Sequence, residues 1–342
     1  MSVEMETRSP APRPTQTAKG RLRVLAPPVT GQEFVLIGVI AVLWILLAFA
    51  TPAFMSAGSI QPLLGAVAPI ALIGIGMTVV IITGGIDVSV GAMIAVCSVI
   101  TAKLVLVQAG LGLPVALLIA IVVGGVLGLG NGALIAYGRV HAIIITFGTA
   151  NIFLWISLRL FNSSTVNNIP DTLAPLGNGA AGRTLGVPNS FLVTVVLVAI
   201  AWFYLRHTAG GRHFYAIGGD PLAAQLAGVK VRQRVLVAYL LTGLLTGLAS
   251  CIVVAQGSNL GQNVGNGKEL AVIAAVVIGG TSITGGRGSV LGTVLGALLV
   301  QTVASGVTQL GWRSELSDLF VGIAIIIAVG ADLIRERARR KR

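Results

Sequence analysis

Residues 62–107 read PLLGAVAPIALIGIGMTVVIITGGIDVSVGAMIAVCSVITAKLVLV, two apolar runs separated by the stretch TGGIDVSVG at Thr83–Gly91. Each run has about twenty residues, which is the length that an α-helix needs to cross the hydrocarbon core of a bilayer. Asp87 lies between them, where a carboxylate is costly and needs a structural or functional reason. The stretch therefore predicts two membrane helices joined by an unusual polar break.

The composition of the whole chain supports a membrane protein. Of its 342 residues, 55% belong to the AVILMFWYC set and only 10% are charged, whereas a soluble domain is about one quarter charged. The apolar runs are continuous rather than alternating, which argues against a transmembrane β-barrel. We predict an all-α, polytopic transmembrane helical bundle of about ten spans, near residues 33–50, 62–83, 88–107, 112–136, 142–161, 190–205, 235–256, 270–283, 289–310 and 318–333.

The distribution of positive charge predicts the orientation. With the N-terminus inside, 18 of the 23 Lys and Arg residues fall on the cytoplasmic side and 5 fall outside, which favours an N-in, C-in topology. The net charge of +12 lacks the aromatic interleaving of a nucleic-acid surface, so no nucleic-acid partner is expected. The basic end RERARRKR is instead expected to anchor against anionic membrane lipid.

Three regions follow from this distribution. Residues 1–30 are proline-rich and polar, and they predict a disordered cytoplasmic N-terminal tail. Residues 31–334 form the membrane domain, with a cytoplasmic loop at about 206–234, and residues 335–342 form a basic cytoplasmic C-terminal tail. No short apolar region with a cleavage site opens the chain, so no signal peptide is expected.

The sequence contains no signature of catalysis or metal binding. Cys97 and Cys251 lie inside apolar runs without a Cys/His cluster, so neither a metal site nor a disulfide is expected. No nucleophile–base–acid set and no GxxxxGK[ST] phosphate loop occurs. We expect a transport role, no catalytic residue and no cofactor bound by this chain. If ATP drives transport, another subunit must hydrolyse it.

Asp87 has three interpretations. It precedes the third apolar run, where it could cap a helix N-terminus together with Ser89. It could instead lie at a translocation path or gate, or couple transport to protons. Gly84 and Gly85 precede it, and Gly279 and Gly280 punctuate a later cytoplasmic junction. Such glycine-interrupted segments in two halves are typical of transporters with internal repeats.

Other polar residues are weaker candidates. Glu269, next to Lys268, is expected at the outer end of the eighth span, as a solvated boundary or a contact for an outside partner. Asn131 and Asn151 are expected to be buried amides that hydrogen-bond between helices or contact the solute. His141, beside a cytoplasmic arginine, is a poor candidate for catalysis or metal binding.

Two glycine series predict close helix packing. Gly124, Gly128 and Gly132 lie on one helix face, and Gly288, Gly292 and Gly296 lie on another. Glycines at this spacing let two backbones approach closely in a membrane. A pore-lining role is the alternative.

The cytoplasmic loop 206–234 contains a second feature of interest. The turn Gly218–Gly219–Asp220–Pro221 predicts a helix start, and a short amphipathic helix is expected over 222–227, ended by Gly228. Such a helix could dock in a groove of a partner protein. The pattern alone fits an interfacial helix equally well.

Three stretches together resemble the permease subunits of ribose/xylose/arabinose/galactoside-class ABC importers. They are TGGIDVSVGAM at 83–93, GRHFYAIGGDPLAAQLAGV at 211–229 and IGGTSITGGRGSVLGTVLGALL at 278–299. HAIIITFGTANIF at 141–153 is similar to a further family segment, with His141 and Ala142 where proline-containing versions are usual. The resemblance covers about residues 35–335.

The resemblance implies a bacterial inner-membrane, multi-pass permease with several partners. These are a cytoplasmic ABC ATPase that uses ATP and Mg²⁺, a periplasmic sugar-binding protein, and a second permease copy in a homo- or heterodimer. It also implies that the loop after the sixth span holds the helix that couples to the ATPase. The family pattern EAAxxxG maps onto Leu222, Ala223, Ala224 and Gly228, with Asp220 just before it and a leucine at the glutamate position.

The implied mechanism is alternating access. A loaded binding protein would dock on the outer loops, including 162–189 and 256–269, and ATP-driven closure would move the coupling helix. Asp87 would then order the broken junction near the path, and the solute would be a monosaccharide, rhamnose or autoinducer-2. The alternative is a stand-alone secondary carrier or channel with Asp87 in ion coupling.

Overall fold

The computed structural model describes residues 31–138 and 140–340, with side chains to residue 330, so the predicted N-terminal tail lies outside the described residues. Each predicted apolar segment forms a helix, and eight of these helices are long and apolar enough to cross a membrane. The ten are α1 Gly31–Ala50, α2 Ala57–Ile82, α3 Val90–Val99 with π-helical turns over Ile100–Gln108, α4 Leu113–Gly138, α5 Ala142–Phe161, α6 Asn189–His207, α9 Val231–Ala255, α10 Lys268–Ile278, α11 Val290–Gln309 and α12 Glu315–Arg340.

Two helices in the second half of the chain, α10 and α12, differ in length from the predicted segments. Helix α10 has only 11 residues, fewer than the roughly twenty that a membrane span needs. Helix α12 runs to Arg340, so most of the predicted basic tail continues this helix. The described chain is an all-α bundle, as the sequence predicts.

Helix α2 forms the centre of the bundle. Every residue from Val67 to Ile82 is buried, because α6, α9, α10 and α11 pack around it. A helix that is apolar on all faces is suited to such a position. By contrast, α1, α4, α5 and α6 expose broad apolar faces, including those of Phe49, Val126 and Trp155, as expected of helices that face lipid.

The first glycine series brings α4 against α9, the most extensive helix pair in the bundle. A Cβ built on Gly124 would collide with the backbone of Gly243 and Gly247, and one on Gly128 with that of Tyr239 and Gly243. In the second series, Gly292 contacts Gly279 and Gly296 contacts Ala275. Both series therefore pack helices closely, as the first interpretation predicts.

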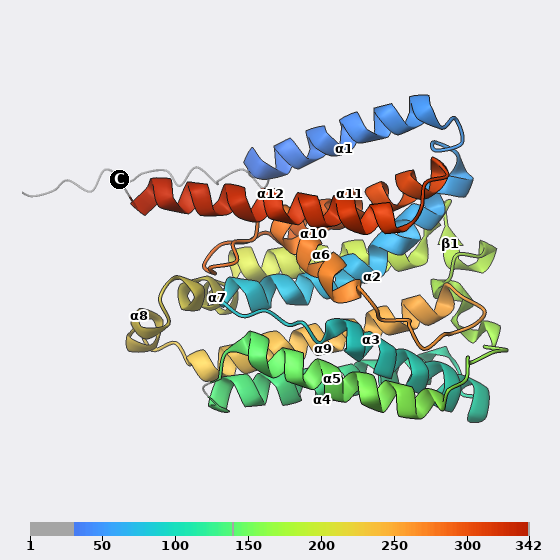
Figure 1. Ribbon diagram of the computed structural model, residues 1–342. Helices are drawn as coiled ribbons and strands as arrows, with labels where there is room; N and C mark the ends of the chain where they lie inside the picture. Colours follow the sequence, from blue (N-terminus) through green and yellow to red (C-terminus); the bar gives the residue numbers. More distant parts are fainter. Residues whose placement is uncertain (1–30, 139, 341–342) are drawn as a thin grey trace, which may run out of the picture.

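The loops divide between two opposite ends of the bundle (Figure 1). At one end, the α8 end, lie α7 Ala209–Gly219 and α8 Pro221–Leu226, together with the C-terminal end of α12. At the other, the hairpin end, β1 Arg183–Thr184 pairs antiparallel with β2 Val187–Pro188, after short 3-10 turns at Asp171–Leu176 and Ala180–Gly182.

The two loops expected to lie outside are joined at the hairpin end. The backbone N–H of Val166 donates to the carbonyl of Leu260 at 3.0 Å, and the N–H of Leu260 donates back at 2.9 Å. This bridge connects loop 162–188 with loop 256–267. The two predicted outer loops thus form one surface.

Two helices begin inside the bundle rather than at its ends (Figure 1). The α2–α3 linker, residues 83–89, leaves α2 at the α8 end and runs back into the bundle, where α3 begins. Helix α10 also begins within the bundle, after the loop from the hairpin end. A backbone contact joins the two starts, because a Cβ on Gly265 would collide with the carbonyl of Gly91.

The first turn of α1 holds the loop between α10 and α11. The Ser289 hydroxyl donates to the buried Glu33 carboxylate, and the Gln32 side chain lies against Gly280. Sequence reasoning did not single out either residue of α1. The signal was weak because both lie at the edge of an apolar run.

Candidate functional site

Asp87 belongs to a buried chain of hydrogen bonds. Its Oδ1 accepts from the backbone N–H of Ser89 at 2.9 Å and from the Ser89 hydroxyl at 2.6 Å. The Ser89 hydroxyl in turn accepts from the Asn131 side-chain amide of α4 at 2.8 Å. All three side chains are 0% exposed. This chain fixes the α2–α3 linker to α4.

The expected helix cap is not formed. Ser89 is the N-cap residue of α3, and neither its side chain nor that of Asp87 accepts from an N–H inside the helix. Asp87 instead closes a turn of the linker onto Ser89, as short carboxylate side chains do in loops. Its interpretation as a residue that orders the broken junction agrees with these contacts, and the capping interpretation is wrong.

The α2–α3 linker lies between two pockets that share no lining residue. Thr83, Gly84 and Gly85 line a pocket at the α8 end together with Tyr239 and His141, here called the Tyr239 pocket. Val88, at the far end of the linker, lines a second pocket. The hydroxyl of Thr146 in α5 donates to the Ile86 carbonyl at 3.2 Å, so the linker is also tied to α5.

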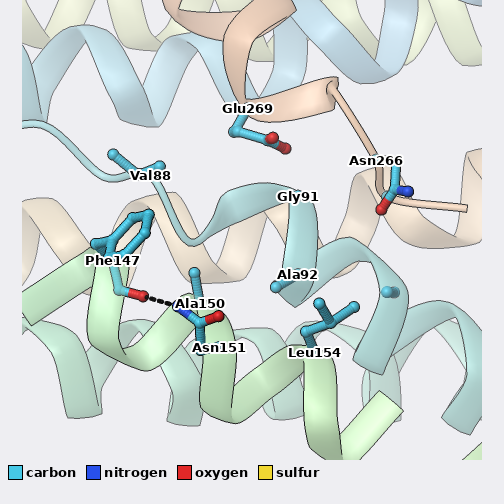
Figure 2. A pocket seen from close by; sticks show the side chains of 11 residues that line it. Val88, Gly91, Ala92, Phe147, Ala150, Asn151, Leu154, Asn266 and Glu269 are labelled. Carbon is cyan, nitrogen blue, oxygen red and sulfur yellow. Dashed lines mark hydrogen bonds between the residues drawn. The ribbon is translucent and has the colours of Figure 1, made fainter. Parts of the chain in front are cut away.

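The second pocket, here called the α3–α5–α10 pocket, lies where α3 and α10 begin (Figure 2). Its walls are mainly apolar, and its polar side chains come from three different segments. The lining residues are Val88, Gly91, Ala92 and Ala95 of the linker and α3, Phe147, Ala150, Asn151 and Leu154 of α5, and Gly265, Asn266 and Glu269 around the start of α10.

Glu269 is the charged residue of this pocket. It is the second residue of α10, and its carboxylate contacts Gly91 in the first turn of α3. Among the described residues, none hydrogen-bonds to this carboxylate or forms an ion pair with it. The sequence predicted a boundary position at the outer end of a span. Glu269 does lie at this end of the helix, but the end is within the bundle, where Glu269 lines a pocket between helices rather than a solvated boundary.

The two asparagines behave differently. Asn131 is buried and bonds between helices, as predicted. Asn151 is exposed, and its amide donates to the Phe147 carbonyl of its own helix at 2.8 Å, so the predicted burial of Asn151 is wrong. Its carbonyl oxygen is left for the pocket that it lines. Figure 2 shows Asn151 on α5, across the pocket from Glu269.

At the α8 end, three segments far apart in the sequence meet through their backbones. A Cβ on Gly218 of α7 would collide with the Ile82 carbonyl and the Gly286 nitrogen. The N–H of Gly286 donates to the same Ile82 carbonyl at 2.9 Å. We call this contact the glycine junction. It connects α7 to the end of α2 and to the α10–α11 loop, which begins at Gly279 and Gly280.

Helix α8 has the predicted local structure. The Asp220 carboxylate accepts from the N–H groups of Leu222 and Ala223 at 2.9 and 3.0 Å, and Pro221 occupies the first turn. Gly228 ends the segment with φ +86°, a conformation that favours glycine. Ala224 is buried against α7, whereas Leu222 and Leu226 are 66% and 82% exposed. Gly219 ends α7 just before the cap.

Sequence reasoning missed two residues of these sites. Tyr239 of α9 is completely buried and its hydroxyl lies close to Gly85. Asn266 lines the α3–α5–α10 pocket from a polar loop. Neither residue has a local pattern that marks it, because each acquires its position from a segment distant in the chain. Helix α7 was also missed within the loop 206–234.

Comparison with known proteins now decides the class. Residues 59–329 match the family described as branched-chain amino acid transport system / permease component. The chain belongs to this family. It is therefore a multi-pass membrane permease, a transport component rather than a catalytic one. No match to a solved structure was found.

Relatives of this permease have named substrates. The ribose import permease protein RbsC of Escherichia coli strain K12 is 34% identical over 319 residues, covering 93% of this chain and 98% of that protein. RbsC of Bacillus subtilis is 36% identical over 85% of this chain and 89% of that protein. The fructose import permease protein FrcC of Rhizobium meliloti is 34% identical, over 82% of this chain and 79% of that protein.

Proposed function

We propose that this permease forms the translocation pathway of an ATP-binding cassette importer in a bacterial inner membrane. The solute is a monosaccharide or sugar-like molecule. This choice rests on the relatives, which are named for ribose and fructose import, whereas the family description names branched-chain amino acids. We favour sugars because two differently named sugar permeases match most of the chain.

The observation that carries the proposal is the glycine junction. Helix α8 is capped and presents Leu222 and Leu226 outward, as a helix that docks in a groove does. It follows directly on α7, whose end contacts α2 and the α10–α11 loop. Gly219, Asp220, Pro221, Leu222, Ala223, Ala224 and Gly228 would therefore form the element that couples to the ATPase.

Movement of α8 would reach the pathway through short backbone contacts. Glycine residues at the junction leave no flexible side chains that could absorb a displacement. The displacement would pass to the end of α2 and hence to the α2–α3 linker, which separates the two pockets. We propose that the linker, with Gly84, Gly85, Asp87 and Ser89, is the gate between them, and that Gly279 and Gly280 hinge the other loop. Asn131 holds the gate to α4.

The partners follow from the two ends of the molecule. A cytoplasmic ABC ATPase, which binds the ATP and Mg²⁺, would contact α8. A periplasmic sugar-binding protein would contact the surface that loops 162–188 and 256–267 form together. A second permease copy, identical or related, would face the exposed α5 side of the α3–α5–α10 pocket and complete the pathway.

The decisive experiment combines purification with transport. The tagged permease is extracted in mild detergent together with its genome-encoded partners, and the co-purifying proteins are identified by mass spectrometry. The complex is then reconstituted in vesicles with binding protein, and uptake of D-ribose and D-fructose is measured with and without ATP. We expect a stoichiometric ATPase, and uptake that requires both ATP and binding protein.

The alternative of a stand-alone carrier makes the opposite prediction. A carrier would be purified without an ATPase and would transport in ATP-free vesicles when an ion gradient is imposed. That result would overturn the importer proposal. The bonds of Asp87 Oδ1 to Ser89 favour a structural role for this carboxylate. Its Oδ2 is buried without a hydrogen-bond partner among the described residues, so transport measurements must decide between this role and ion coupling.

A further inference from the structure

We propose that the α3–α5–α10 pocket is a binding subsite for a neutral, hydroxylated solute, with the Glu269 carboxylate as its principal hydrogen-bond acceptor. This inference rests on the proposed importer function and specifies which part of the pathway contacts the solute. No residue of this pocket other than Asn151 was expected on the pathway from sequence.

The Glu269 carboxylate lies at the N-terminal ends of two helices. It belongs to the first turn of α10 and contacts the first turn of α3 at Gly91. The N-terminus of a helix carries a partial positive charge of about half a unit. The partial positive charges of the two helix N-termini are together about equal to the charge of one carboxylate. The two helix starts therefore favour a carboxylate acceptor at this place in the pocket.

The polar groups of the pocket include several acceptors without a donor. Among the described residues no donor occupies the Glu269 carboxylate, and the amide of Asn151 is taken by Phe147 while its carbonyl oxygen remains open. The pocket thus offers acceptors from two sides and the Asn266 amide from a third. No Lys or Arg lines it. A carboxylate and carbonyl oxygens accept from hydroxyl groups.

The wall of the pocket combines close backbone contacts with an apolar surface. Gly91 and Gly265 bring the two helix starts into backbone contact, and any Cβ on Gly91 would displace the Glu269 carboxylate. Phe147, Leu154 and the alanines supply an apolar surface for the carbon faces of a solute. A few placed polar groups on an apolar wall are typical of small-molecule sites. An anionic solute finds no cationic side chain there.

Charged thiol reagents can measure the electrostatics of this pocket without knowledge of the solute. Cys97 and Cys251 are completely buried, so the native chain should be a quiet background. A reporter cysteine is placed in the wall by Ala150→Cys. A control is placed by Leu185→Cys at the tip of the hairpin, outside the pocket and outside the long helices, where Leu185 is 100% exposed.

Labelling rates with anionic, neutral and cationic methanethiosulfonates are compared with and without Glu269→Gln. Removing the carboxylate leaves the two helix termini uncompensated, so the anionic-to-cationic rate ratio at Ala150→Cys should rise several-fold. The ratio at Leu185→Cys should not change. D-ribose or D-fructose should slow the labelling of Ala150→Cys. D-ribonate, which is anionic, should not slow it. Glu269→Gln should abolish the protection by the two sugars.

Several results would overturn the inference. The inference is wrong if Ala150→Cys is not labelled, or if Glu269→Gln leaves the anionic-to-cationic rate ratio unchanged. It is also wrong if neither sugar slows the labelling. Uptake with ATP and binding protein is measured in parallel for the chain with native Glu269. If that uptake is ATP-dependent while the labelling fails, the subsite inference is wrong and the importer proposal stands. Absence of ATP-dependent uptake refutes the importer proposal itself.

Discussion

Substitution of the single residue Asp87 distinguishes a role in ordering the gate from a role in ion coupling. Asp87→Asn keeps the side-chain volume and an oxygen that can accept from Ser89. We therefore expect ATP-dependent uptake to stay within a few-fold of that of the unmodified chain. A coupling carboxylate would instead make the Asn variant inactive. Uptake in reconstituted vesicles measures the difference.

The matched variant at this position is Asp87→Leu. It leaves the buried donors of Ser89 without their acceptor, which costs about 1–3 kcal/mol for an unsatisfied buried group. We expect a lower thermal unfolding temperature in detergent and loss of uptake. Equal behaviour of the Asn and Leu variants would contradict the role assigned to the hydrogen bonds.

Asp220 gives the second test at this scale. Its carboxylate caps α8, and replacing such a cap with alanine costs about 1 kcal/mol of helix stability. Asp220→Ala should weaken the association with the ATPase and lower uptake, whereas Asp220→Asn, also a good cap, should retain both. Co-purification and ATPase assays compare the two. If both variants lose ATPase association and uptake equally, the negative charge of Asp220 is itself required and its role as a helix cap is not sufficient.

Single residues also show where sequence reasoning ends. Asp87, Ser89 and Asn131 could be selected because polar groups stand out in apolar runs. The partner of Glu269 is Gly91, nearly 180 residues earlier in the chain, and no local pattern connects them. Asn151 was expected to be buried because its run is apolar, yet that run faces outward. Burial depends on which helix face meets a neighbour, and apolar runs without a polar face do not reveal it.

At the scale of the helices, the glycine contacts between α4 and α9 predict a position-specific effect. Gly128→Val places a side chain against the backbone of Tyr239 and Gly243, and such overpacking costs roughly 1–3 kcal/mol. Thermal unfolding in detergent should occur at a lower temperature. Gly130→Ala, in the same helix with no atom within 4 Å of its Cβ, is the control and should unfold like the unmodified chain.

Helices were predictable to the extent that hydrophobicity alone defines them. The ten apolar segments all became helices, because about twenty apolar residues in lipid have few alternatives to a helix, although α10 ends earlier and α12 later than expected. The breaks were harder to predict. The interior starts of α3 and α10 depend on the contact between Gly91 and Gly265, and α7 lies in a polar loop without a long apolar run.

The two opposite ends of the whole molecule each present an exposed leucine that can be tested, Leu226 on α8 and Leu185 at the tip of the hairpin, which is 100% exposed. Under the importer proposal these leucines contact different partners. Leu226→Glu should release the ATPase from the purified complex. Leu185→Glu should leave the ATPase bound but reduce the stimulation of its activity by loaded binding protein.

Co-purification and stimulated ATPase activity measure both variants side by side. A crossed result, in which Leu185→Glu releases the ATPase, would reverse the predicted orientation of the molecule. Unchanged behaviour of both variants would mean that other surfaces make the two contacts.

The central position of α2 has a consequence for how the protein is made. This helix is synthesised second, but three of the helices that cover it, α9, α10 and α11, leave the ribosome only in the last third of synthesis. Until then the faces of α2 that these three helices cover can contact only lipid or an insertion factor. Biogenesis must therefore end with late helices displacing those temporary neighbours, so a nascent chain stopped before residue 231 cannot reach the native arrangement, however complete its earlier spans are.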